Sequence, residues 1–260
     1  YIREKIGRPF GFEISLDETE EKTKDEDLLF YLNEWKASGA DADFIAPNIG
    51  FRKRMDFRGN LEELEARVAR QAAIASFFGA LLSIHSGSGT TPYSGKGRGT
   101  YKALLKATGG YLKYKISGVY YELLLEILAS FSPSLRERKL YNRIFDEVYR
   151  YLREQVDEGG MLSSELLKKQ LERYEREASR GTRERRDARA TFFRFNSFLA
   201  LNLRDSTGRR YFRDELVDLY NSHEKLRELV DEGVEKLTLR LIEGLRFADN
   251  FEKHASKMQK

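Results

Sequence analysis

Leu81-Leu82-Ser83-Ile84-His85-Ser86-Gly87-Ser88-Gly89 is the stretch that decides the fold, because it predicts a short buried strand that runs into a glycine-rich loop. Side chains alternate along a strand, so Leu82 and Ile84 point to one face while Ser83 and His85 point to the other. The strand therefore carries an imidazole to its own C-terminal end, where α/β sheets bind their ligands. His85 is one of three histidines in the chain. It is either a satisfied core residue or a functional group, and this strand alone leaves both readings open.

Further strands and helices alternate around this stretch. Strands are predicted at Pro9–Leu16, Asp43–Ala46 and Tyr111–Ser117, with helices between them at 25–38, 61–78 and 101–108. Three helical stretches, a fifth strand at Thr191–Leu199 and two final helices follow. This alternation favours parallel strands joined by helical crossovers. We therefore predict an α/β, (β/α) barrel-like fold. A complete barrel has eight strands, so five predicted strands mean either that some strands escape prediction or that the chain carries only part of a barrel.

The predicted elements divide the chain into a segment with the polar pocket and a helical remainder. Residues 1–130 form the barrel-like segment, and residues 131–260 form a helix-rich part with the fifth strand, which we expect in the same domain. The chain begins at Tyr1 without a signal-peptide pattern, so we expect a fragment or a processed chain.

Composition restricts the class of protein. The chain of 260 residues is 40% hydrophobic, and no apolar run approaches the roughly 18 residues that a membrane span needs, so we expect no membrane partner. Cysteine is absent, which excludes disulfides and thiolate metal sites and favours the cytoplasm. The many charged residues favour a thermophilic source. The sequence leaves monomer and homo-oligomer both open.

Charge gives a weak argument for nucleic acid. The net charge is +4, and the arginines of residues 173–194 alternate with acidic residues, which is typical of a solvated helix. The pI of about 9.0 leaves a nucleic-acid-associated helical protein as one further hypothesis. Because the charge pattern argues against it, we expect no nucleic-acid partner.

Polar side chains gather on the strand faces that point away from the predicted helices. These side chains are Glu13, Ser15, Asp17, Ser83, His85, Lys113, Lys115, Ser117, Arg194 and Asn196. A barrel packed only for stability would fill this face with branched apolar residues, and a buried charge without a partner is costly. We therefore predict a solvated pocket for a polar ligand; the alternative is a sheet face open to water.

The residue types in this set indicate its chemistry. Asp17 and Glu18 can bind a divalent cation or act as a base. His85 can ligate a metal or transfer protons near neutral pH. Lys113 and Lys115 can neutralise a carboxylate, stabilise an enolate or act as a base. The set suits an anionic, hydroxylated small molecule whose carbonyl must be polarised.

The loop over residues 86–100 is rich in Gly, Ser and Thr and carries Lys96 and Arg98. It is similar to a phosphate-binding Walker A loop, but the spacing is one residue too long and Gly97 stands where Ser or Thr should hold magnesium, which excludes an NTPase. The loop either contacts an anionic group of the ligand or is a flexible lid.

Several motifs, in this order and spacing, resemble the tagaturonate epimerase family: Ser15-Leu16-Asp17-Glu18, Ala46-Pro47, His85-Ser86-Gly87-Ser88 and Gly109-Gly110 through Lys115-Ile116-Ser117-Gly118. The likeness covers about residues 12–128 and is thin beyond. Members of that family are barrel-type enzymes that interconvert tagaturonate and fructuronate with a divalent metal. The resemblance implies a sugar-acid (keto-uronate) epimerase or isomerase.

Roles for individual residues follow from the residue types together with this resemblance. Asp17, Glu18, His85 and Lys115 are the candidate catalytic residues, and Asp17 and His85 are also the candidate ligands of a divalent metal ion. Lys96 is expected to meet the substrate carboxylate and Lys115 to stabilise oxyanion charge. The candidate substrate-binding residues are Ser86, Ser88, Lys96, Lys113, Ser117 and Arg194. Both deprotonation next to a carbonyl and retro-aldol cleavage stay open.

The chain also departs from the family's pattern. Lys113 and Arg194 stand where the family has strand histidines, Gly233 and Leu237 lie near its paired helix histidines, and Gly95 replaces an aspartate before Lys96. A second hypothesis is therefore a relative without catalysis that acts as a carbohydrate-binding or regulatory protein.

Overall fold

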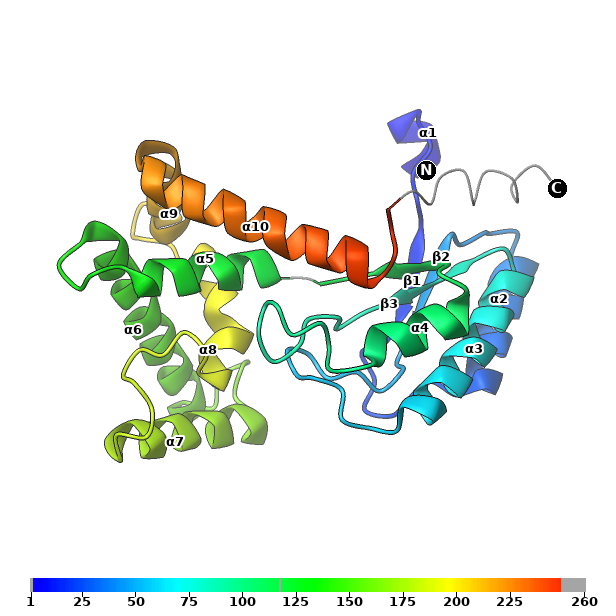
Figure 1. Ribbon diagram of the computed structural model, residues 1–260, viewed down its shortest axis with the longest axis horizontal. Coiled ribbons are helices and arrows are strands. Elements are labelled where there is room, and N and C mark those ends of the chain that lie inside the picture. The colour runs from blue at the N-terminus through cyan, green and yellow to red at the C-terminus, as the bar shows by residue number, and fades with distance from the viewer. Residues whose placement is uncertain (1, 117, 249–260) are drawn as a thin grey trace. The chain divides into compact units, whose positions relative to one another are not determined.

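The computed structural model describes residues 2–116 and 118–248, which belong to two compact units (Figure 1). Unit 1 comprises Tyr1–Ser117 and Thr238–Lys260, and unit 2 comprises Gly118–Leu237. The boundary falls at Gly118, whereas the sequence placed a change of character near residue 130. Helix α10 (Glu224–Gly244) begins in unit 2 and ends in unit 1.

Unit 1 is built on a parallel sheet of four strands, in the order β1 (Glu13–Leu16), β2 (Phe44–Pro47), β3 (Leu81–Ile84) and β4 (Leu112–Tyr114). Helices α2 (Asp25–Ala37), α3 (Leu61–Phe77) and α4 (Thr100–Thr108) make the crossovers. A short helix α1 (Ile2–Ile6), which the sequence did not predict, precedes β1. The prediction of parallel strands with helical crossovers is confirmed.

One face of this sheet is covered by helices α2, α3 and α4, which lie together on the same side (Figure 1). Strand residues at alternate positions, among them Ile14, Ile45 and Leu82, form one buried core with Leu28 of α2 and Val68 of α3. Because neighbouring side chains point to opposite faces, this leaves the other face to the residues between them. The apolar alternation thus places the polar residues of β1, β3 and β4 on one face, as the sequence predicted.

The secondary-structure elements among the described residues of unit 2 are all helices, joined by turns and loops. It contains α5 (Val119–Ser130), α6 (Arg136–Asp157), α7 (Glu165–Ser179), α8 (Thr191–Asn196), a 3-10 helix η1 (Ser197–Leu201), α9 (Tyr211–Ser222) and the first part of α10. Its core is rich in aromatic rings: Phe145 lies 5.5 Å from Phe192 and 4.5 Å from Phe193, centroid to centroid. The sequence predicted three helical stretches and two final helices in this part of the chain, and the structure has α5, α6, α7, α9 and α10 there.

The fifth strand predicted at Thr191–Leu199 is wrong, because this segment forms α8 and η1. Its aromatic and β-branched residues favour a strand locally. A strand would send Phe192 and Phe193 to opposite faces, yet both are buried in the same aromatic core. The amide of Arg194 donates to the carbonyl of Ala190, as in a helix. Tertiary packing therefore overrides the local preference.

None of the helices within residues 2–116 and 118–248 combines the length and the apolar character that crossing a bilayer requires.

Candidate active site

His85 is held between two carboxylates from strand β1 and the residue after it. Its Nδ1 lies 2.9 Å from Asp17 Oδ1 and its Nε2 lies 2.9 Å from Glu13 Oε1. His85 directly follows β3, and its side chain is only 7% exposed. Glu13 and Asp17 are four residues apart on an extended segment, so they share a face and bracket the ring. The sequence predicted this face, and the structure brings these side chains together.

Lys113 of β4 completes this cluster. Its Nζ donates to Glu13 Oε2 at 2.9 Å and lies 4.9 Å from the centre of the Phe44 ring. Burial raises the pKa of Glu13, but contacts with Ser83, Lys113 and His85 outweigh it and lower the pKa to about 2. Glu13 is therefore ionised at neutral pH and contacts both Lys113 and His85.

Hydrogen bonding limits how the ring can be protonated. An ionised carboxylate only accepts, so His85 Nε2 carries a proton where it bonds the ionised Glu13. Nδ1 faces Asp17 on the other side of the ring. An imidazole held between two carboxylates is a group of the type that serves as a general acid–base.

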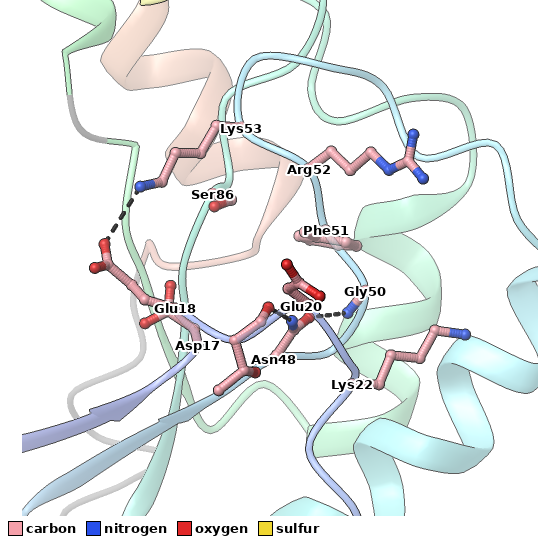
Figure 2. A pocket seen from close by; sticks show the side chains of 11 residues that line it. Asp17, Glu18, Glu20, Lys22, Asn48, Gly50, Phe51, Arg52, Lys53 and Ser86 are labelled. Carbon is pink, nitrogen blue, oxygen red and sulfur yellow. Dashed lines mark hydrogen bonds and ion pairs between the residues drawn. The ribbon is translucent and has the colours of Figure 1, made fainter. Parts of the chain in front are cut away.

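A pocket of about 490 Å³ opens beside this cluster at the C-terminal ends of β1, β2 and β3 (Figure 2). Asp17 lines it and also bonds His85, so this carboxylate links the buried cluster to the open space. Glu18 and Ser86 line it too. Glu18 is exposed, and one of its carboxylate oxygens lies 3.3 Å from Lys53 Nζ. The carboxyl edge of a parallel sheet is where such folds bind ligands.

The sequence reading missed the residues that the loop after β2 brings to the pocket, namely Asn48, Gly50, Phe51, Arg52 and Lys53. Figure 2 shows Lys53 directed toward Glu18, while Arg52 extends elsewhere. Within the described part of the chain, the Arg52 guanidinium has no hydrogen-bond or ion-pair partner. These residues could have been predicted from the sequence. Pro47-Asn48 ends a buried strand, and because ligands bind at the C-terminal ends of parallel strands, the loop after β2 belongs at the same edge of the sheet.

Other residues named from the sequence lie away from the pocket lining. Lys115 follows β4 and its backbone amide donates to Ile84, while its side chain is exposed. Ser88 is buried, and its carbonyl accepts from Lys96 Nζ at 3.3 Å. Lys96 is fully buried and points at protein carbonyls. Ser117 lies outside the described residues. The sequence predicted that Lys96 meets a substrate carboxylate. In the structure its ammonium is directed at protein carbonyls instead.

Arg194 belongs to unit 2 and is placed on α8, not on a strand. Its guanidinium donates to Glu122 Oε2 from Nε at 3.1 Å and from Nη2 at 2.8 Å. Both side chains are buried. This ion pair gives Arg194 a role in the core of unit 2.

The described residues fit a divalent metal only in part. Asp17 and His85 supply one carboxylate and one imidazole, and these bond each other. Over residues 2–116 and 118–248, no group of three or more His, Cys, Asp or Glu side chains is placed to hold an ion. Catalytic zinc sites use three protein ligands, so these residues do not form a complete site of that kind.

Glu13→Gln should remove an acid-sensitive part of the stability. The pKa of Glu13 falls from 4.5 to about 2 on folding, so its contribution is complete above pH 4.5 and is lost as the pH falls toward 2. At neutral pH the contribution is on the order of 3 kcal/mol. Urea unfolding of both proteins between pH 7 and pH 2 measures it, and the difference between them should shrink below pH 4.5. The exposed Glu18→Gln is the matched control, and an equal deficit of Glu13→Gln at pH 7 and pH 2.5 would contradict the prediction.

Comparison with known proteins identifies the family to which the sequence is similar. The family model of tagaturonate epimerase, UxaE, matches residues 1–239. The tagaturonate/fructuronate epimerase of Thermotoga maritima is 32% identical over 144 residues, which are 54% of this chain and 27% of that protein.

Solved structures of fructuronate-tagaturonate epimerase UxaE from Cohnella laeviribosi share the fold. The native structure has a TM-score of 0.61 at 25% identity over 94% of this chain and 48% of its own. A glycerol complex of the same enzyme gives 0.61 at 24% identity, over 94% and 47%. This chain thus spans about half the length of those structures. Since the family model extends over most of its residues, the chain belongs to the tagaturonate epimerase family.

Proposed function

We propose that this chain carries catalytic residues of a sugar-acid epimerase that interconverts the keto-uronates tagaturonate and fructuronate. The observation that carries the proposal is the family match over residues 1–239. It is supported by Asp17, which lines the pocket and bonds the buried His85, since a residue set of this kind suits proton transfer on a hydroxylated anion.

His85 is the proposed general acid–base. Its imidazole ring is positioned by two carboxylates, and Asp17 extends from it to the pocket. A proton that leaves the ring for a substrate oxygen would return to it from the product or from water, so the ring ends each turnover as it began. Ser86 lines the pocket and is a proposed hydrogen-bond partner of the sugar. Lys115 stays the proposed stabiliser of oxyanion charge on the sequence argument alone, since its exposed side chain lies outside the pocket lining.

The substrate carboxylate needs a cation, and Arg52 is the group we propose for it. Arg52 lines the pocket, whereas Lys53 is close to Glu18 and Lys96 is buried against carbonyls. A guanidinium binds a carboxylate through two parallel N–H bonds, which also fixes the orientation of the sugar.

The test is an NMR assay in which the chain is incubated with tagaturonate or with fructuronate and the other isomer is followed. Appearance of the partner isomer from either side supports the proposal. Tagatose, which lacks the carboxylate, is the matched control and should react far more slowly. Binding of the keto-uronates without turnover would instead favour a carbohydrate-binding protein, and absence of both would contradict the proposal.

A divalent metal ion, with Asp17 and His85 as ligands, is a separate proposal. Elemental mass spectrometry of the purified wild type and of His85→Ala, side by side, tests it. We expect a stoichiometric metal in the wild type that falls in the variant, because loss of an imidazole ligand weakens binding. Equal content in the two proteins, or none in either, would contradict the assignment of His85 as a ligand.

A further inference from the structure

Lys96 is the most unusual side chain of unit 1, because its ammonium is fully buried and, among the described residues, has no carboxylate partner in hydrogen-bond contact. Lysine is almost never completely buried unless it is paired. Here the compensation comes from the main chain: Nζ donates to the carbonyl of Arg52 at 2.6 Å, to that of Ser86, and to that of Ser88 at 3.3 Å. The face of the Phe51 ring lies 4.8 Å away.

The three carbonyls belong to two different loops. Arg52 lies in the loop after β2, and Ser86 and Ser88 lie in the loop after β3. Arg52 and Ser86 both line the pocket. One ammonium therefore joins two of the three segments that line the pocket, and all three of its N–H groups are used.

The backbone around Lys96 strengthens the same link. The carbonyl of Lys96 accepts from the amide of Phe57 at 2.8 Å and from Thr100 Oγ1 at 3.1 Å. Lys96 and Ser86 both have positive φ values, 65° and 57°, which cost energy in residues other than glycine. Strain of this kind persists only where the surroundings hold it, and it gathers at functional sites.

We propose that Lys96 is a positioning residue, whose buried ammonium holds the loops after β2 and β3 in register and thereby sets the shape of the pocket. The link between the loops stands on the contacts above, whereas its effect on the reaction rests on the proposed function. Burial lowers the pKa of Lys96 to about 8, an effect that the charge of Asp56 opposes. At pH 7 the ammonium form still predominates, so all three donors are available.

Amide hydrogen exchange at pH 7 tests the link without any assay of activity. Lys96→Met keeps most of the length of the side chain and removes the donors. We expect amides in residues 52–57 and 86–89 to exchange at least about tenfold faster in this variant, corresponding to about 1.4 kcal/mol of lost protection. The matched control is Lys102→Met on the exposed side of α4, which should leave both loops unchanged. Unchanged exchange of both loops in Lys96→Met would overturn the proposal.

Chemical rescue separates hydrogen bonding from packing. Lys96→Ala removes the atoms of a propylammonium ion, so added propylammonium should restore slow exchange in both loops, whereas tetramethylammonium, which has no N–H, should not. Equal effects of the two ions would overturn the proposal. If Lys96→Ala does not fold alone, recovery of its folded fraction by propylammonium but not by tetramethylammonium gives the same information.

Kinetics then connect the link to the reaction. In the keto-uronate assay, Lys96→Met should raise KM and lower kcat together, and propylammonium should restore both in Lys96→Ala. If the wild type has no activity while the exchange results hold, the proposed function fails and the link between the loops stands. If the wild type is active and rescue restores exchange but not rate, the positioning role in the reaction is overturned.

Discussion

Replacing His85 by alanine is expected to lower kcat/KM for the interconversion of tagaturonate and fructuronate by about 10²- to 10⁴-fold, the usual contribution of a general acid–base. Imidazole is the side chain that most often acts as a general acid–base, and Asp17 connects the His85 ring to the pocket. A methyl group in place of the imidazole can neither donate nor accept the proton that the reaction moves. NMR or coupled assays of both directions measure the loss.

A second variant separates chemistry from folding. Removing the ring leaves a cavity between Glu13 and Asp17 and takes away the group that both carboxylates contact. We therefore expect His85→Ala to be less stable than the wild type. His85→Gln keeps a donor and much of the volume, and we expect it to fold more stably but to remain far below wild type in rate. His223→Ala, which removes the imidazole that caps α10, is a control and should leave kcat/KM close to wild type. Full activity of folded His85→Gln would contradict the assignment.

The site was predictable where strand periodicity decides it. A buried strand ending in His85 fixes which of its residues face away from the helices, and the same alternation in β1 and β4 places Glu13, Asp17 and Lys113 on that face. Parallel order then brings these strands together. The shared face of His85, Glu13 and Asp17 follows from this pattern, whereas the hydrogen bonds between them appear only in the structure.

Loops and short helices were not predictable in this way. The direction of the Lys96 side chain depends on the positive φ values of Lys96 and Ser86 and on carbonyls from two loops. Neither the φ values nor these contacts can be recognised from the sequence. The lining by Arg52 depends on the same loop geometry.

The placement of Arg194 shows a second limit. The segment Thr-Phe-Phe-Arg-Phe-Asn has strand-like composition, and only the packing of unit 2 decides that Phe192 and Phe193 share a core. The partner of Arg194 lies 72 positions earlier, at Glu122. Local patterns do not report contacts of this range.

Arg194→Met is therefore expected to destabilise unit 2 by about 3 to 5 kcal/mol, because it leaves the Glu122 carboxylate buried without its main cation. The double variant Glu122→Leu/Arg194→Met should recover most of this loss, since two apolar side chains can replace a buried ion pair at little cost. Urea unfolding followed by far-UV circular dichroism measures both, and the fluorescence of Trp35 reports on unit 1 separately.

The matched control is the pair of the exposed Arg189 and the half-buried Glu126, whose side-chain nitrogen and oxygen lie 3.2 Å apart. Arg189→Met should change stability by no more than about 1 kcal/mol, because solvent screens a pair of this kind. The two arginines are five residues apart on the same segment, so the contrast isolates burial. A rise in KM for keto-uronates with unchanged stability of Arg194→Met would contradict the structural role and restore the substrate-binding role that the sequence predicted.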